Sequence, residues 1–106
     1  MTKDLNDANF ASELASKKIA VVAFKAAWCG PCKTLSPIID SLGEELTEDE
    51  DVTIGRLDVD ANSDSAHKYG VRSIPTLIFF ADGVEAKRLV GMQSKDTLKT
   101  TIDSLR

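Results

Sequence analysis

The sequence is poor in cysteine, histidine and long apolar runs. Its 106 residues include two cysteines and one histidine, too few cysteines for a disulfide scaffold. No apolar run approaches the roughly 20 residues that span a bilayer, and residues 1–5 lack the apolar core of a secretion signal. We therefore expect no membrane association and a reducing location where the chain is made, the cytoplasm.

Strong positive charge is absent as well. The net charge is -4, and the six acidic residues between positions 44 and 51 exceed the whole acidic excess. Because the remaining charges nearly balance, the sequence offers no basic patch for nucleic acid and no polybasic membrane anchor. We interpret the acidic stretch as a solvated helix end and loop. The alternative is a calcium or partner site, but the stretch lacks the alternate-position ligands and the glycine of a calcium loop.

The remaining composition is that of an ordinary globular domain. Hydrophobic residues make up 42% and charged residues 28%, close to the averages for such proteins. A chain of 106 residues buries about two-thirds of its unfolded surface, which is enough for one core. No repeat, low-complexity tract or linker interrupts the sequence, so we expect residues 1–106 to form a single domain.

Hydrophobic patterning predicts alternating helices and strands, and therefore an α/β fold with a mixed sheet. Strands are expected at residues 19–24, 52–59, 75–80 and 84–90, the last two joined by an Asp82-Gly83 turn. Helices are expected after Asn6 or Asp7, from Pro31 to Leu46, from Asn62 or Ser63 to Tyr69, and after Ser94. The chain would thus begin with a helix. The apolar phase slips between Ile54 and Leu57, which predicts either a bulge or burial on both faces. Pro37 predicts a kink in the second helix.

The two cysteines lie where the first predicted strand meets the second predicted helix. A thiol attacks a disulfide as its thiolate, and a helix N-terminus stabilises that negative charge. Cys29 stands just before the first turn and Cys32 one turn further in. We assign Cys29 as the nucleophile and Cys32 as the resolving thiol, because we expect the first sulfur at the exposed loop edge and the second toward the helix interior.

Three other uses of the cysteine pair remain open. A structural bridge across so short a loop would remove only about 2 kcal/mol of unfolded-state entropy. Half of a zinc site would need two further ligands, and the only histidine, His67, lies in a different predicted helix and is interpreted as a surface residue. Simple burial of two small apolar residues would leave the neighbouring Trp28 and Gly30-Pro31 unexplained.

The run Trp28-Cys29-Gly30-Pro31-Cys32-Lys33 resembles the active-site signature of the thioredoxin family. The resemblance continues through Pro37, residues 69–76, Asp82-Gly83 and Val90-Gly91, and so covers essentially the whole chain. It implies the thioredoxin fold, a central mixed five-stranded sheet flanked by four helices, in a monomer with no cofactor beyond its redox-active disulfide. It also implies that Cys29 protrudes beside a loop ending in a cis proline, Pro75.

The resemblance further implies a docking surface for disulfide-containing client proteins. The substrate would pair with the backbone of Ile74 as a short added strand. The surface would comprise Trp28, Gly30, Pro31, Ile74, Pro75, Val90, Gly91 and Met92. Trp28 could instead pack in the core.

The implied activity is reduction of protein disulfides by an electron carrier that a thioredoxin reductase recharges, in the service of cell redox homeostasis. One alternative is an oxidant or isomerase, which Gly30-Pro31 disfavours because strongly oxidising relatives tend to place a histidine there. The other alternative is a binding module that uses the docking surface without turnover.

Three positions depart from the family pattern. Ala23 replaces a buried aspartate that is thought to help deprotonate the resolving thiol, so we expect slower resolution and a more readily ionised Cys29. Arg56 replaces a lysine that pairs with that acid, and it is expected to reach solvent or another carboxylate. Lys25 stands where an aromatic is common and is either a solvated rim charge or a cation that steers acidic partners or favours ionisation of Cys29.

Overall fold

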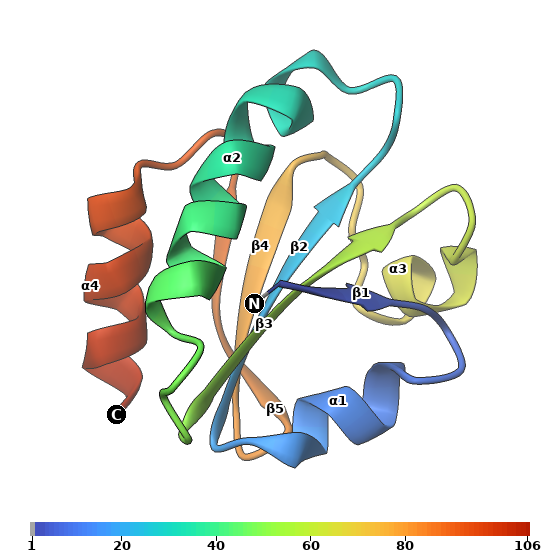
Figure 1. Cartoon of the computed structure of the whole chain (residues 1–106). Coiled ribbons are helices and arrows are strands. Elements are labelled where there is room, and N and C mark those ends of the chain that lie inside the picture. The colour runs from blue at the N-terminus through green and yellow to red at the C-terminus, as the bar shows by residue number, and fades with distance from the viewer. Residues whose placement is uncertain (1) are drawn as a thin grey trace.

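The computed structural model describes residues 2–106, which form one mixed sheet with helices on both faces (Figure 1). In chain order the elements are β1 (Lys3–Leu5), α1 (Phe10–Ser16), β2 (Ile19–Lys25), α2 (Gly30–Glu45), β3 (Val52–Asp58), α3 (Ser63–Lys68), β4 (Thr76–Ala81), β5 (Val84–Val90) and α4 (Lys95–Leu105). The strand order is β1-β3-β2-β4-β5, with the first three strands parallel and the last two antiparallel to their neighbours. The expected α/β fold is confirmed.

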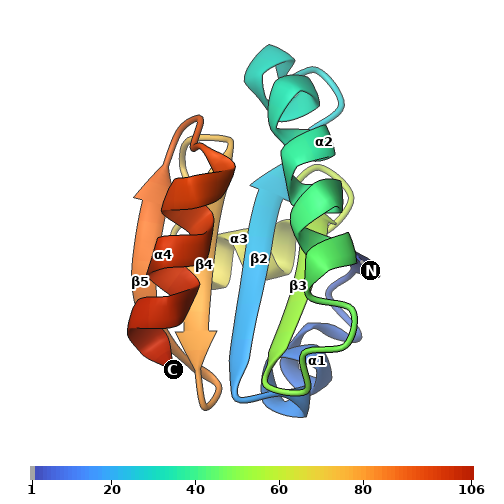
Figure 2. The ribbon, with the colours of Figure 1, turned by 60° about the vertical axis from the view of Figure 1, so that its left-hand side comes forward.

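The sheet separates two hydrophobic cores. Alternate residues of a strand point to opposite faces, so β2 supplies Val21 to one core and Phe24 to the other. Helices α2 and α4 cover the first face, as Figure 2 shows, and α1 and α3 cover the second. Because β2 is covered on both sides, its run of apolar residues has no polar alternation.

Strand β3 is buried on both faces and carries no bulge against β2. Its pairing with β2 runs unbroken from Ile19↔Val52 to Lys25↔Asp58. Ile54 belongs to the core beneath α2, whereas Leu57 belongs to the opposite core. Of the two expectations for this strand, two-sided burial is therefore right. The irregularity in the sheet lies instead between Phe79 and Phe80, where β4 pairs with β5.

The expectation that the chain begins with a helix is wrong. Residues Lys3–Leu5 form β1, which pairs with β3 at the edge of the sheet. A Cβ added at Gly55 would lie 2.9 Å from the Leu5 side chain and 3.0 Å from the Lys3 carbonyl oxygen, so the close approach requires glycine. Only Leu5 of the three strand residues is buried, which leaves too short a pattern to indicate a strand.

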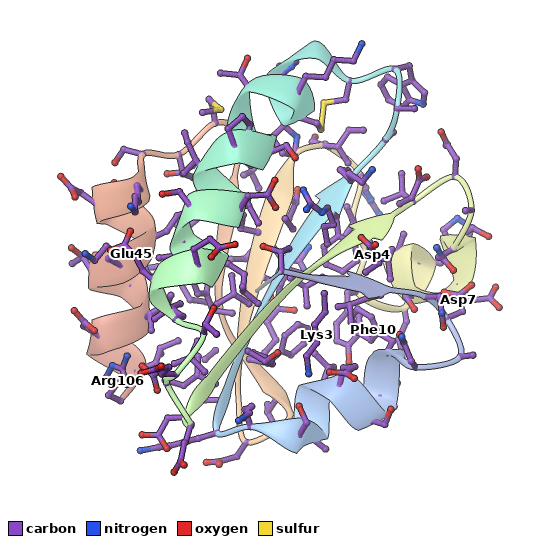
Figure 3. All side chains as sticks on the ribbon, in the orientation of Figure 1. Lys3, Asp4, Asp7, Phe10, Glu45 and Arg106 are labelled. Carbon is purple, nitrogen blue, oxygen red and sulfur yellow. A yellow bond between two sulfur atoms is a disulfide. The ribbon has the colours of Figure 1, made fainter. Side chains whose placement is uncertain are left out.

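The first helix also starts later than expected. Asn9 is its N-cap, and Phe10 is its first residue. Asn6 caps the preceding turn instead. Its Oδ1 accepts the backbone N–H of Asn9 at 2.8 Å, and Asn9 Oδ1 accepts the backbone N–H of Asn6 at the same distance. Asp7 reaches across to α3, where its Oδ1 accepts the backbone N–H of Ser65 at 2.9 Å (Figure 3). This bond ties the first loop to a helix far along the chain.

Stability should fall as the pH drops below the ordinary carboxyl range. Hydrogen bonds from Ser65 lower the pKa of Asp7, and a hydrogen bond from Arg106 lowers the pKa of Asp49. The folded chain therefore binds fewer protons than the unfolded chain, so this stabilisation is present above about pH 4 and is lost as the pH falls through the folded-state pKa values. In urea titrations at pH 7 and pH 3, Asp7→Asn should lose less stability between the two pH values than the parent chain. An equal loss would contradict this role of Asp7.

The expected positions of α2, α3, α4 and the β4–β5 turn are confirmed, and Pro37 lies inside α2, where the kink stays a prediction. Asp82 and Gly83 have φ values of 53° and 83°, which make the tight β4–β5 turn. The Ser94 side chain accepts the backbone N–H of Thr97 at 3.1 Å and caps α4. In the acidic stretch at the end of α2, Glu45 faces α4 and forms ion pairs with Lys95 and Lys99, while Asp49 pairs with Arg106 (Figure 3).

Candidate active site

Cys29 and Cys32 are joined by a disulfide at the start of α2, just beyond the end of β2. Their Cα atoms are 5.3 Å apart, and Figure 3 shows the bond at the first turn of the helix. Cys29 has an extended backbone and is the N-cap of α2, with Pro31 in the first turn. Its Sγ accepts the backbone N–H of Cys32 at 3.2 Å. The strand-to-helix junction thus holds the first sulfur against the unpaired N–H groups of a helix of 16 residues.

This geometry favours negative charge on the sulfur of Cys29. A helix N-terminus carries about half a positive charge, and a hydrogen bond to an ionised sulfur is stronger than one to a neutral sulfur. Cys32 lies inside the first turn, where its own N–H serves as that donor. The helix N-terminus therefore stabilises a thiolate at Cys29, the cysteine that the sequence also indicated as the nucleophile.

The expectation that Cys29 protrudes is wrong for this disulfide form. Cys29 is 4% exposed and Cys32 is 6% exposed, so exposure does not distinguish them. Ala26 packs with the two cysteines, and Val59 and Ile74 lie against this cluster. The capping position, and not solvent access, is what sets the two sulfurs apart.

The loop before β4 lies directly against the cysteine pair. The Ile74–Pro75 peptide bond is cis, as the family resemblance implied. Ile74 is half-buried on the cysteine cluster, and Pro75 is buried. The Pro75 carbonyl oxygen accepts the N–H of Gly91 at 2.8 Å, which fastens the end of β5 to this loop. Gly91 has a φ of 92°, a backbone conformation that favours glycine.

Exposed apolar side chains gather at this end of the sheet. Among the described residues four large hydrophobic side chains are exposed: Trp28 at 70%, Val84 at 68%, Val90 at 59% and Met92 at 43%. Three of these four belong to the docking surface expected from the sequence, and only Val84 lies at the opposite end of β5. Gly30 and Pro31 are exposed as well. The structure thus brings the expected docking residues together around the disulfide, where β2 and β5 end and β4 begins.

Trp28 is fixed by a residue that the sequence did not single out. Its Nε1–H donates to Asp60 Oδ2 at 2.8 Å, and the exposed ring excludes packing in the core. Asp60 follows the end of β3, which runs parallel to β2. Residues after the ends of adjacent parallel strands meet at one edge of the sheet, and this was the only signal in the sequence for the contact.

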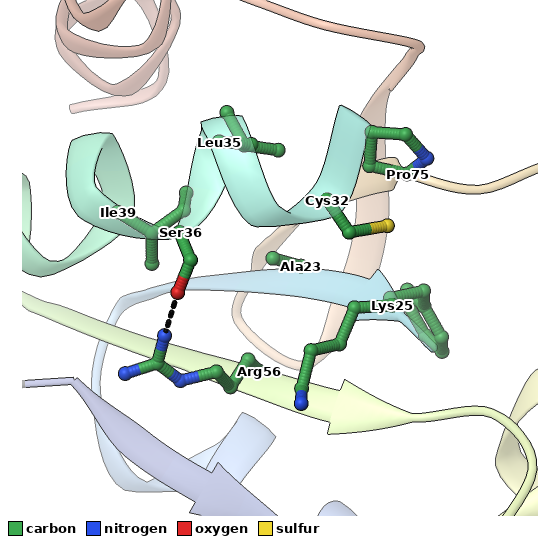
Figure 4. Close-up of a pocket in the computed structure, with 9 residues that line it drawn as sticks. Ala23, Lys25, Cys32, Leu35, Ser36, Ile39, Arg56 and Pro75 are labelled. Carbon is green, nitrogen blue, oxygen red and sulfur yellow. Dashed lines mark hydrogen bonds between the residues drawn. The ribbon is translucent and has the colours of Figure 1, made fainter. Parts of the chain in front are cut away.

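Cys32 and Ala23, the position at which the family resemblance implied an acid, line one small cavity (Figure 4). Its lining comprises Ala23, Phe24, Lys25, Cys32, Leu35, Ser36, Ile39, Arg56 and Pro75. Arg56 donates to Ser36 Oγ at 2.6 Å and to Asp40 Oδ1 at 2.5 Å, so the expectation that it reaches another carboxylate is confirmed. The lining itself contains no carboxylate.

Residues 2–106 offer neither a metal centre nor a membrane span. Within that range no group of three or more histidine, cysteine, aspartate or glutamate side chains is arranged to hold a metal ion. No helix in the same range has the length and apolar character needed to cross a membrane. His67, the single histidine, is exposed on α3.

A disulfide-bonded pair whose first cysteine caps a helix beside a cis-proline loop is the arrangement of a thiol-disulfide oxidoreductase. The family model for thioredoxin matches residues 1–104. Over 98 residues the chain is 47% identical to thioredoxin from Chlamydia muridarum, covering 92% of each chain, and 44% identical to thioredoxin from Mycobacterium tuberculosis H37Rv, covering 92% of this chain and 83% of that one. The solved structure of a mutant thioredoxin from Halobacterium salinarum matches with a TM-score of 0.86 at 35% identity, over 98% of this chain and 89% of that chain. The chain belongs to the thioredoxin family.

Proposed function

We propose that this chain is a protein-disulfide reductase in which Cys29 is the catalytic nucleophile and Cys32 resolves the intermediate. The observation that carries the proposal is the capping geometry: Cys29 lies at the N-terminus of α2, and its sulfur accepts the N–H of Cys32. The helix favours the Cys29 thiolate, and the spacing of the pair keeps the second sulfur within bonding reach of the first.

The proposed reaction has two exchange steps. First, the Cys29 thiolate attacks one sulfur of a client disulfide, forming a mixed disulfide while the other client sulfur leaves as a thiolate and takes a proton from water. Second, Cys32 loses its proton and attacks the Cys29 sulfur, which breaks the bond to the client. The client gains two electrons and two protons, and the chain is left with the Cys29–Cys32 disulfide seen in the structure.

The client is proposed to bind across the exposed apolar end of the sheet. An extended client backbone would pair with Ile74, whose loop is held against the cysteines by the bond from Gly91 to Pro75. Trp28 and Val90 flank this path and present apolar surface that a client would remove from water. Gly30, Pro31 and Met92 complete the surface, which suits unrelated clients because backbone pairing and apolar contact require no particular side chain.

Recharging is assigned to a thioredoxin reductase. The chain carries no nucleotide or flavin motif, so the electrons for reducing Cys29–Cys32 must come from another protein. In this proposal residues 1–106 act as one monomeric domain in the cytoplasm, an electron carrier whose disulfide is its only redox centre. The curated relatives named thioredoxin and the single sheet that unites the described residues support this assignment.

A coupled assay tests the function. The oxidised chain is mixed with NADPH, a bacterial thioredoxin reductase and an excess of a protein disulfide, and NADPH oxidation is followed. We expect steady NADPH consumption that requires both the chain and the protein disulfide. If the reductase cannot reduce Cys29–Cys32, or the reduced chain does not pass electrons on, the proposed function is wrong.

Restoring a carboxylate at position 23 should disfavour ionisation of the active-site thiols. Ala23 lines the cavity beneath Cys32, so an aspartate there would place negative charge near both developing thiolates. For Ala23→Asp we expect the pH profile of thiol alkylation by iodoacetamide to move upward by about one pH unit. Ala23→Asn is the uncharged control and should leave the profile near that of the parent. An unmoved profile in Ala23→Asp would contradict the role assigned to the missing acid.

A further inference from the structure

Cys32 lines a groove that contains none of the residues of the docking surface. Besides the small cavity of about 10 Å³, enough for about one water molecule, Cys32 lines an adjoining open groove of about 290 Å³. The groove is lined by Lys25, Ala26, Ala27, Cys32, Lys33 and Ser36. Water can therefore approach the side of the resolving cysteine although the residue itself is nearly buried.

Lys25 lines both spaces together with Cys32. Residues 23 and 25 are alternate positions on β2 and so share the face covered by α2. The methyl group of Ala23 leaves room there, and the Lys25 side chain extends from β2 toward β3 beside this gap (Figure 4). The neighbouring positions on β3 are Arg56 and Asp58, which pair in register with Ala23 and Lys25.

The two cations of the cavity differ in how their charge is compensated. Arg56 is bound by Asp40 and Ser36, so its charge is already paired. Lys25 forms no ion pair within residues 2–106. Of the two cations that line this cavity, Lys25 is therefore the one that no described carboxylate binds directly.

Two further charged groups face this region. From β3, Asp58 lies on the same face as Lys25, but its Oδ1 accepts the backbone N–H groups of Asp60 and Ala61 at 2.9 Å and 3.3 Å. From α2, Lys33 lines the open groove and adds a second positive charge at its rim. The charged side chains that line the two spaces beside Cys32 are thus all cationic, whereas an acid at position 23 would add a negative charge there.

We propose that Lys25 is a positioning residue for the resolution step, replacing the buried acid by an opposite strategy. Its ammonium stabilises the Cys32 thiolate, and the thiol proton passes to water in the open groove. The thiolate then attacks the Cys29 sulfur, the bond from Cys29 to the client breaks, and the client sulfur leaves with the electron pair and takes a proton from water. The inference rests on the proposed function, because it assumes that Cys32 is the resolving thiol.

The experiment isolates Cys32 in a Cys29→Ser background and measures its alkylation by uncharged iodoacetamide from pH 5 to pH 10. Lys25→Met keeps the length of the side chain and removes its charge. We expect it to slow alkylation of Cys32 at pH 7 by about three- to tenfold and to move the midpoint of the profile upward, with the effect limited by solvent screening. The difference from the parent should shrink in 0.5 M NaCl, because salt screens a partly exposed charge.

Two variants separate charge from shape. Lys25→Arg restores the cation and should return the profile to that of the parent. Lys87→Met removes an exposed lysine from β5 and is the matched control, which should leave the profile unchanged. If Lys25→Met alkylates like the parent, or if Lys25→Arg behaves like Lys25→Met, the inference is wrong. The coupled assay on the chain with both cysteines reports separately on the proposed function, so the two failures are distinguishable.

Discussion

Replacing Cys29 with serine is expected to abolish disulfide reduction, lowering turnover by roughly a thousandfold or more. Serine replaces the capping sulfur at the start of α2 by an oxygen, which can still accept the backbone N–H of Cys32 but cannot supply a thiolate at neutral pH. Cys32 is then the only cysteine left in the chain. Cys32 lies inside the first turn and lacks the capping position that activates Cys29. The measurement is NADPH oxidation in the coupled assay, with the fold of the variant checked by circular dichroism.

The same variant separates a catalyst from a binding module. Cys29→Ser leaves Trp28, Val90 and Met92 in place, so a module that acts through the docking surface alone would keep its effect on a client. A matched control is Ser36→Ala, which removes a hydroxyl bound to Arg56 and no sulfur, and which should retain turnover within about tenfold. Undiminished activity in Cys29→Ser would contradict the assignment of the nucleophile.

Truncating Phe80 to alanine is expected to cost about 3–5 kcal/mol of unfolding free energy and to lower the melting temperature by roughly 15–30 °C. Phe80 is fully buried on β4 and joins two other elements of its core. The Phe80 ring packs edge-on against the ring of Phe10 on α1, with 6.1 Å between the ring centroids. It also packs edge-on against the ring of Tyr69 at the end of α3, with 5.2 Å between the ring centroids. Loss of the ring removes one contact from β4 to each helix of this face, while Phe10 keeps its contact with Phe24 on β2.

An exposed strand position provides the comparison. Val84 is 68% exposed on β5, and Val84→Ala should change the unfolding free energy by less than about 1 kcal/mol. The measurement is urea unfolding followed by circular dichroism, with thermal melts of the same samples. A Phe80→Ala loss no larger than that of Val84→Ala would show that this aromatic cluster does not hold the second core together.

Helices and strands with a long hydrophobic pattern could be predicted from the sequence, whereas those with a short pattern could not. The apolar run of β2, the helical spacing of α2 and the Asp82-Gly83 turn each carry their own signal. Strand β1 has one buried residue and exists because Gly55 lets it approach β3, which is a tertiary contact. The start of α1 was misplaced because Asn6 and Asp7, both good caps, bind other backbone groups.

The sequence predicted the reactive cysteine pair, but it did not predict the residues that pack around the pair. The cysteine pair and its spacing are local, so their position at the start of α2 followed from the chain itself. The burial of Cys29 did not follow, because it depends on Val59 and Ile74 packing from distant segments. The partners of Arg56 and Trp28, which are Asp40 and Asp60, are likewise set by how helix and strands meet.

The role of Cys29 as nucleophile is tested most directly by identifying the covalent intermediate. A Cys32→Ser variant in the reduced state is mixed with an oxidised client protein, free thiols are blocked, and the product is digested and analysed by mass spectrometry. Because the resolving thiol is absent, we expect a stable mixed disulfide that joins a client cysteine to Cys29. Release of fully reduced client without any adduct at Cys29 would contradict it.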